Sequence, residues 1–220
     1  MALVFERGRP AAEDALVREA LARSIDRAAI YNVLLQRQGE VAGGLLPQWL
    51  SGYAFLFATA PDLERARKLW SQISPAPRPL VLGYDLTDPL ARAVAERIAV
   101  DAREAGITLQ VSWQASPSQG GPPRRLDGRL VRRRIQSAAP GEALTQLADS
   151  FALGEPLRLR HSATPEELFA AERAIVESFR VIPLFQLPEI YGLSPRVKNW
   201  SGTRWGGWRL DDVWLDVEKP

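Results

Sequence analysis

Three consecutive arginines, Arg132, Arg133 and Arg134, form the one unusual cluster of charge in the sequence. They fall in a segment, residues 130–135, in which apolar and basic residues alternate, and this pattern predicts a half-buried strand. On such a strand Arg132 and Arg134 point to one face and Arg133 to the other. The segment is then either the solvated face of a sheet or a wall that binds carboxylates and other anions, since a guanidinium offers a planar, bidentate fork. The residues leave both interpretations open.

Groups that could do covalent or acid–base chemistry are sparse. The only histidine, His161, lies in a loop before a predicted helix, and no serine and carboxylate can be assembled around it. Asp211 and Asp212 are more typical of a turn before the last strand than of a metal pair, because no histidine is near them. The motifs HExxH and GxGxxG and the P-loop are absent. We therefore expect a protein that is not an enzyme, with no catalytic residue, no metal site and no cofactor.

The composition is that of an ordinary globular protein. The 220 residues, of which 46% are hydrophobic and 25% charged, suffice for one large domain or two small ones. A net charge of +2 gives no case for binding nucleic acid, and the absence of cysteine excludes disulfides and thiolate ligands. No window reaches the roughly 18 apolar residues of a bilayer span, and the first ten residues do not resemble a secretion signal. We expect either a cytosolic protein or a piece of a longer one.

A β-α-β unit near residues 80–113 is the strongest structural signal. The apolar run in 79–85 predicts a strand, and residues 107–115 predict a second strand. Between them, residues 88–106 predict a helix that buries Val94, Ile98 and Ala102 and ends at Gly106. Two strands joined in this way are parallel with a right-handed crossover. The remaining elements alternate similarly, so we predict an α/β fold with a mixed sheet flanked by helices.

Several other boundaries carry local signals. Asp14 and Asp62 each precede a segment whose apolar residues recur at helical spacing, so we predict that they are N-cap residues. Either Ser24 or Asp26 caps a further predicted helix between these two. Thr164 and Glu167 form a capping box, with proline at the first helical position. Residues 181–195 form an apolar segment that prolines interrupt. We predict two short strands there, at "LFQL" and "EIYGL", or one broken strand.

Tryptophan is the abundant aromatic residue near the end of the chain. Four of the seven tryptophans lie between positions 200 and 214. Tryptophan in such numbers is usually packed in a core or between lobes, and stacking of one ring on a ligand is the alternative.

Five segments, taken together and in order, resemble the family 5 extracellular solute-binding proteins, the peptide- and nickel-type receptors of ABC importers. They are "VREALARSIDRAAIYNVLL" (17–35), "GLLPQW" (44–49), "DLERARKLW" (62–70), "LTDPLARAVAERIAVDAREAGITLQV" (86–111) and "AERAIVESFRVIPLFQLPEIYGLSPRVKNW" (171–200). Members of this family have two lobes that trap a ligand between them. The resemblance covers only the C-terminal lobe. It implies a periplasmic-binding-protein-like lobe over residues 1–200, followed by a Trp-rich segment, 201–220, that returns toward the hinge or the other lobe.

The resemblance implies a binding module of an ABC-type importer for a peptide or another small solute. Its partners are then the solute, an ABC permease and the N-terminal lobe, with no nucleic acid. Its location is periplasmic or extracellular, with a membrane anchor through an N-terminal part absent here. The alternative is the ligand-sensing domain of a cytosolic transcription regulator, since some regulators carry a domain of this family.

The sequence departs from the family pattern in the loop that contacts ligand. Many members carry Trp-x-x-Asp-Tyr-x-Asp-Pro there, whereas here Arg134 stands near the tryptophan position and Ala139 in place of the aspartate before Pro140. The acidic contact for a peptide amine is therefore missing from this loop, and arginines would favour an anionic group. We predict that the ligand-binding residues are Arg132, Arg134, Gln136, Trp113 and Trp205.

Overall fold

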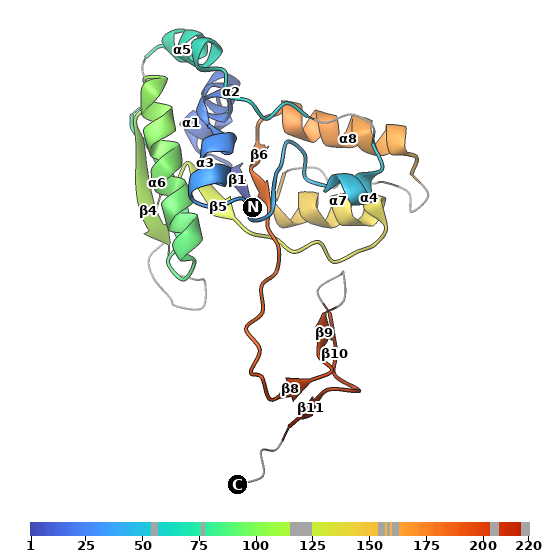
Figure 1. The fold of residues 1–220 in the computed structure, drawn as a ribbon. Helices are drawn as coiled ribbons and strands as arrows, with labels where there is room; N and C mark the ends of the chain where they lie inside the picture. The colour runs from blue at the N-terminus through green and yellow to red at the C-terminus, as the bar shows by residue number, and fades with distance from the viewer. Residues whose placement is uncertain are drawn as a thin grey trace.

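A five-stranded mixed sheet forms the centre of the main body (Figure 1). The computed structural model describes residues 1–53, 57–75, 78–114, 125–153, 157, 159, 163–202 and 207–216. The sheet has the order β4-β3-β5-β1-β6, made of β4 (Leu109–Gln114), β3 (Leu80–Asp85), β5 (Gly128–Val131), β1 (Ala2–Phe5) and β6 (Val181–Pro183). Strand β3 is parallel to β4 and β5, while β1 is antiparallel to both β5 and β6. The predicted α/β lobe with a mixed sheet flanked by helices is confirmed.

The predicted β-α-β unit is also confirmed. Strands β3 and β4 pair in parallel from Leu80 with Leu109 to Asp85 with Gln114, joined by α6 (Pro89–Glu104). The Asp88 side chain caps α6 by accepting from the Ala91 N–H at 3.0 Å. The helix ends before Gly106, whose φ of +84° is left-handed and therefore favours glycine.

Short helices and longer amphipathic helices cover the two faces of the sheet. Their bounds are α1 (Pro10–Glu13), α2 (Ala15–Ser24), α3 (Arg27–Val33), α4 (Gln48–Ser51), α5 (Leu63–Ser71), α7 (Pro140–Ser150) and α8 (Pro165–Glu177). The predicted caps at Asp14 and Asp62 and the capping box of Thr164 with Glu167 are confirmed. Asp26, not Ser24, caps α3, because Ser24 is the last residue of α2 and its hydroxyl donates to the Leu21 carbonyl.

The core consists of two hydrophobic clusters on opposite faces of the sheet. On one face Leu3 and Phe5 of β1 pack with buried side chains of α2, α3, α5 and α6. On the other face Ala2 and Val4 pack with buried side chains of α7 and α8 and of the segment 45–53. Successive side chains of a strand alternate between faces, so β1 contributes to both clusters. Figure 1 shows α5, α2 and α6 on one side of the sheet and α7 and α8 on the other.

The prediction of a strand over 130–135 is wrong beyond Val131. Strand β5 ends there because its neighbour β1 pairs Ala2 with Val131 and its other neighbour β3 pairs no further than Arg129. Without a strand to pair with, Arg132, Arg133 and Arg134 continue as irregular, exposed chain. The simple alternation of their side chains between two faces therefore does not hold.

The proline-interrupted segment forms one of its two predicted strands. Strand β7 (Phe185–Gln186) lies within "LFQL" and pairs with β2 (Glu40–Val41). The second predicted strand, "EIYGL", is wrong, since residues 187–194 are irregular and Ile190 is 80% exposed. No neighbouring strand in the described chain lies against this segment, so its backbone has no ladder to join.

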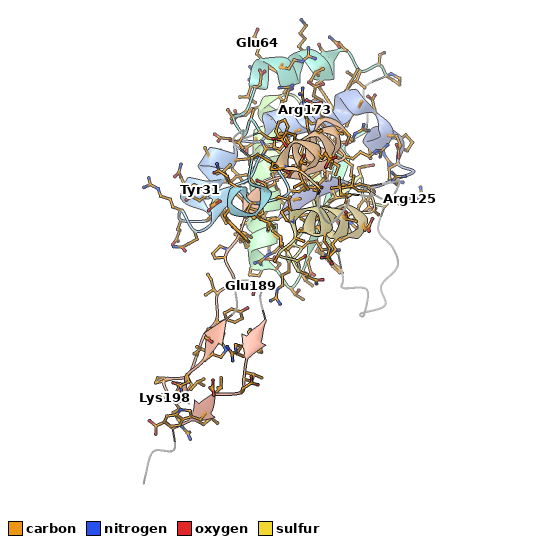
Figure 2. The ribbon with its side chains drawn as sticks, turned by 90° about the vertical axis from the view of Figure 1, so that its right-hand side faces the viewer. Tyr31, Glu64, Arg125, Arg173, Glu189 and Lys198 are labelled. Atoms are coloured by element: carbon orange, nitrogen blue, oxygen red, sulfur yellow. The ribbon has the colours of Figure 1, made fainter. Side chains whose placement is uncertain are left out.

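A tail leaves the body after this segment. It contains β8 (Val197–Lys198), β9 (Ser201–Gly202), β10 (Trp208–Arg209) and β11 (Trp214–Leu215). Two antiparallel pairs, β8 with β11 and β9 with β10, fold the tail on itself. Figures 1 and 2 show it extending away from the helices, with Glu189 where it leaves the body and Lys198 within it. The predicted division of the chain at residue 200 stays a prediction.

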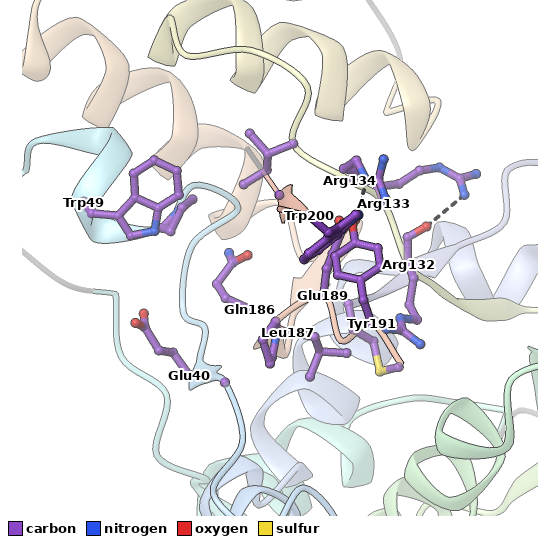
Figure 3. A pocket seen from close by; sticks show the side chains of 16 residues that line it. Glu40, Trp49, Arg132, Arg133, Arg134, Gln186, Leu187, Glu189, Tyr191 and Trp200 are labelled. Carbon is purple, nitrogen blue, oxygen red and sulfur yellow. Dashed lines mark hydrogen bonds and ion pairs between the residues drawn. The ribbon is translucent and has the colours of Figure 1, made fainter. Parts of the chain in front are cut away.

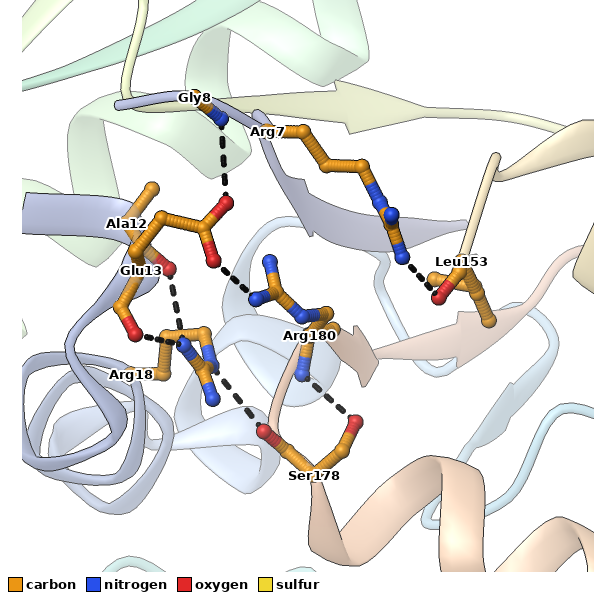
Figure 4. A network of polar contacts seen from close by, with 8 residues as sticks. All are labelled: Arg7, Gly8, Ala12, Glu13, Arg18, Leu153, Ser178 and Arg180. Atoms are coloured by element: carbon orange, nitrogen blue, oxygen red, sulfur yellow. Dashed lines mark hydrogen bonds and ion pairs between the residues drawn. The ribbon is translucent and has the colours of Figure 1, made fainter. Parts of the chain in front are cut away.

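A polar network joins the beginning of the chain to the end of α8 (Figure 4). Arg18 is buried and donates to the carbonyls of Ala12 and Glu13 and, at 3.1 Å, to that of Ser178. Arg180 donates to the Glu13 carboxylate, which also accepts from the Gly8 N–H. These contacts fix the turn between β1 and α2 against the chain that enters β6.

We expect Glu13 to give the folded state part of its acid sensitivity. The Arg180 hydrogen bond, with help from the Gly8 N–H, lowers the pKa of Glu13 from 4.5 to about 2. A lowered folded-state pKa stabilises the protein above pH 4.5, and that stabilisation is lost as pH falls toward 2. Urea unfolding between pH 2 and pH 7 should therefore show a weaker pH dependence for Glu13→Gln than for the wild type. The exposed Glu64 on α5 is the control, and an equal change in Glu64→Gln would contradict the assignment.

Candidate ligand-binding cavity

A cavity of about 840 Å³ opens at one edge of the sheet (Figure 3). This is the edge at which β5 and β6 end and β1 begins. In open α/β sheets, ligands bind outside the carboxyl ends of the strands. The lining comes from the segment after β5, from the chain around β2 and α4, and from the chain that runs from β7 into the tail.

Arginines form one wall of the cavity. Arg132, Arg133 and Arg134 all line it. The Arg132 guanidinium lies 3.0 Å from the Asp88 carboxylate, the same side chain that caps α6. Arg134 pairs with the Glu189 carboxylate, which also accepts from the Tyr191 hydroxyl. The chain thus supplies its own carboxylates to the first and third arginines.

Aromatic rings lie at two places around the cavity. Trp49 of α4 is 47% exposed, and Figure 3 shows it on the side of Gln186 away from the arginines. Tyr191 and Trp200 lie near the arginines, with ring centroids 5.0 Å apart. Large rings and a few polar groups around a concave surface are the usual lining of a small-molecule site.

A buried carboxylate holds the wall that carries Trp49. Glu172 of α8 is fully buried and accepts from the backbone N–H groups of Leu45 and Leu46 and from the Tyr53 hydroxyl at 2.6 Å. Burial raises the pKa of Glu172, and these three donors oppose that rise. Burial together with the Glu172 contact also raises the pKa of Tyr53. The carboxylate therefore ties the segment before and after α4 to α8.

Sequence reasoning did not identify Glu172. A signal was present, because Glu172 follows the buried Leu168 by four positions and so lies on the core-facing side of α8. A glutamate on such a face requires hydrogen-bond partners, since an unpaired charge is costly to bury. The sequence could not have named those partners, which are more than 100 positions away.

The structure brings together only part of the predicted site. Arg132 and Arg134 line the cavity, whereas Gln136 is exposed and does not. Trp113 lies on β4, separated from β5 by β3, and is not among the lining residues. Trp205 lies outside the described residues, as does His161.

Other residues of the lining were not predicted. They include Arg133, Glu40, Trp49, Gln186, Glu189, Tyr191 and Trp200. Asp211 and Asp212 form the expected turn before β11. Within the described ranges no three histidine, aspartate or glutamate side chains gather where they could hold a metal ion. Among the described helices, none has the length and apolar character needed to cross a bilayer.

The sequence model of "Bacterial extracellular solute-binding proteins, family 5 Middle" matches residues 1–130. No curated protein sequence matches the chain. Among solved structures, DppA from Helicobacter pylori in complex with the peptide STSA is similar with a TM-score of 0.73 and 15% identity, over 98% of this chain and 47% of that one. AppA from Bacillus subtilis in complex with a nonapeptide is similar with a TM-score of 0.71 and 12% identity, over 97% of this chain and 50% of that one.

NikA from Brucella suis in complex with Fe(III)-EDTA is a third similar structure, with a TM-score of 0.69 and 17% identity, over 84% of this chain and 44% of that one. At these identities the likenesses show the fold alone. The chain spans about half the length of the solved structures that it matches.

Removing the Glu172 carboxylate should destabilise the protein strongly. Glu172→Ala leaves three buried donors without an acceptor, at about 1–3 kcal/mol each, so we expect a loss of about 3 kcal/mol or more in the free energy of unfolding. Glu172→Gln keeps one acceptor oxygen and should lose less. Urea denaturation at neutral pH measures both. The control is Glu166→Ala in the first turn of α8, and a loss there as large as that of Glu172→Ala would refute the explanation.

Proposed function

Because the chain belongs to the family 5 bacterial extracellular solute-binding proteins, we propose that it binds a small solute in the cavity at the edge of its sheet, as part of the binding component of an ABC-type importer. The observation that carries the proposal is the cavity itself. Its volume of about 840 Å³ falls in the range of small-molecule sites, about 300–1,000 Å³. Family membership supports a binding protein that passes its solute on unchanged, rather than an enzyme.

Most of the similar structures named here are described with peptides, and others with different solutes. AppA is described with a nonapeptide, the Helicobacter pylori DppA with the peptide STSA, and a Pseudoalteromonas dipeptide-binding protein with Met-Leu. NikA is described with Fe(III)-EDTA, and a Thermotoga maritima oligopeptide-binding protein with mannohexaose. We take these ligands as the classes to test.

A second lobe completes the site in this proposal. The chain supplies about half of the matched architecture, and the chain that leads into the tail lines the cavity. The tail exposes large apolar side chains, among them Trp208 at 56%, Trp214 at 52% and Leu215 at 61%. Burial of such surface favours association. We propose that the other lobe covers the tail and closes over the solute by a hinge motion, outside the cytoplasm and in contact with an ABC permease.

The test uses the protein at its full natural length with three probes, trialanine, Fe(III)-EDTA and mannohexaose. Binding to the folded state raises the melting temperature, and a probe at 100 times its dissociation constant adds about 2.7 kcal/mol to the free energy of unfolding. We expect at least one probe to bind. Trp49→Ala should then weaken binding about tenfold, or about 1.4 kcal/mol, because tryptophan is enriched among the residues that carry most of a binding energy. Isothermal titration calorimetry measures this loss.

Trp113→Ala is the matched control, because Trp113 is a similarly exposed tryptophan that does not line the cavity. It should leave the affinity unchanged. Binding of none of the probes would count against solute binding. Equal weakening by the two variants would move the site away from this cavity.

A further inference from the structure

The three arginines of the cavity wall are not equivalent. Arg132 is held by Asp88, whose other oxygen is committed to the N-terminus of α6. Arg134 is held by Glu189, which the Tyr191 hydroxyl also contacts. A ligand carboxylate that bound either guanidinium would have to share it with a carboxylate already in place, whose negative charge weakens the attraction. The ion pairs of Arg132 with Asp88 and of Arg134 with Glu189 therefore fix the position of residues 132–134 and neutralise two of their three positive charges.

Arg133 is different, because no carboxylate of the described chain pairs with its guanidinium. Its Nη1 donates to the Arg132 carbonyl at 3.1 Å, and this is a hydrogen bond to a neutral group. A guanidinium has five N–H donors, so the others remain available for a ligand. The side chain is exposed, so an incoming solute can reach it.

Neither Glu40 nor Glu142 forms an ion pair with Arg133 in the described chain. Apart from Glu189, Glu40 is the only acidic residue among the described lining residues, and Figure 3 shows it on the far side of Gln186 from the arginines. Glu142, at the start of α7, accepts from the Ser137 hydroxyl and the Gln146 amide. The arginine wall therefore carries one positive charge that the described chain does not neutralise.

We propose that Arg133 is the anion receptor of this cavity and that the solute carries a carboxylate or a similar anionic group. This inference rests on the proposed function, since it names the class of solute that the same cavity accepts. A guanidinium matches the two oxygens of a carboxylate with two parallel hydrogen bonds, which gives geometric selectivity as well as attraction. Arg132 and Arg134 act as positioning residues that hold the Arg133 backbone.

The experiment compares ligands with and without a carboxylate, using the protein at its full natural length and isothermal titration calorimetry. Trialanine is paired with trialanine amide, and Fe(III)-EDTA with the uncharged mannohexaose. We expect the wild type to bind the member that carries carboxylates, in at least one pair, ten times more tightly or better. Arg133→Gln should reduce that preference at least tenfold, while Arg133→Lys, which keeps the charge but loses the fork, should reduce it less.

Arg103→Gln is the matched control, an exposed arginine at the end of α6 that does not line the cavity, and it should bind as the wild type does. If Arg133→Gln keeps the preference for anionic ligands, or weakens both members of a pair equally, the proposal is overturned. If the wild type binds only mannohexaose or trialanine amide, the anionic class is wrong and solute binding stands. If the wild type binds no probe at all, both the anionic class of solute and solute binding itself are contradicted.

Discussion

The burial of β1 on both of its faces is the constraint on which the rest of the structure depends. All four of its residues, Ala2 to Phe5, are buried, and they alternate between the two hydrophobic clusters. The strand also pairs on both sides, with β5 and with β6. Since a backbone group buried without a partner is costly, β1 has to be paired along both edges as well as packed on both faces. It thereby joins the β-α-β half of the sheet to the β6 side and to α8.

Buried polar groups then hold the irregular chain that surrounds the cavity. Glu172 fixes the segment around α4 to α8. Arg27 is buried and donates to the Pro183 carbonyl at 2.9 Å and to the Thr59 carbonyl at 3.3 Å. Burial lowers the pKa of Arg27 to about 10, so it is still charged at neutral pH. Glu172 thus places the irregular chain beside α4, and Arg27 ties the segment at Thr59 to the end of β6.

Charge pairing gives the cavity its asymmetry. One wall carries three guanidiniums in sequence, yet the folded chain neutralises two of them with carboxylates from α6 and from the start of the tail. The opposite side carries Trp49 and Glu40 around Gln186. A solute that lies across the cavity would thus meet Trp49 at one end, and the arginines with Tyr191 and Trp200 at the other. The exposed apolar side chains of the tail are the surface left for a second lobe in the proposed arrangement.

The sequence by itself determined the features that depend on neighbours a few positions apart. The caps at Asp14 and Asp62, the capping box of α8 and the β-α-β unit all follow from short-range spacing and periodicity. The mixed α/β class follows from the alternation of these elements, and the ordered motifs indicated the family that the comparison then matched.

Only the tertiary structure decided which residues meet at the cavity. The pattern around the arginines predicted a strand to residue 135, but a strand ends where its neighbours stop pairing, at Val131. The partners of Arg132 and Arg134 lie 44 and 55 positions away, and that of Glu172 lies 119 positions away at Tyr53. Trp113 was predicted to contact ligand and Trp49 was not, yet the strand order places Trp113 on β4, away from the cavity that Trp49 lines. Such contacts are set by the packing of distant segments, which local spacing does not encode.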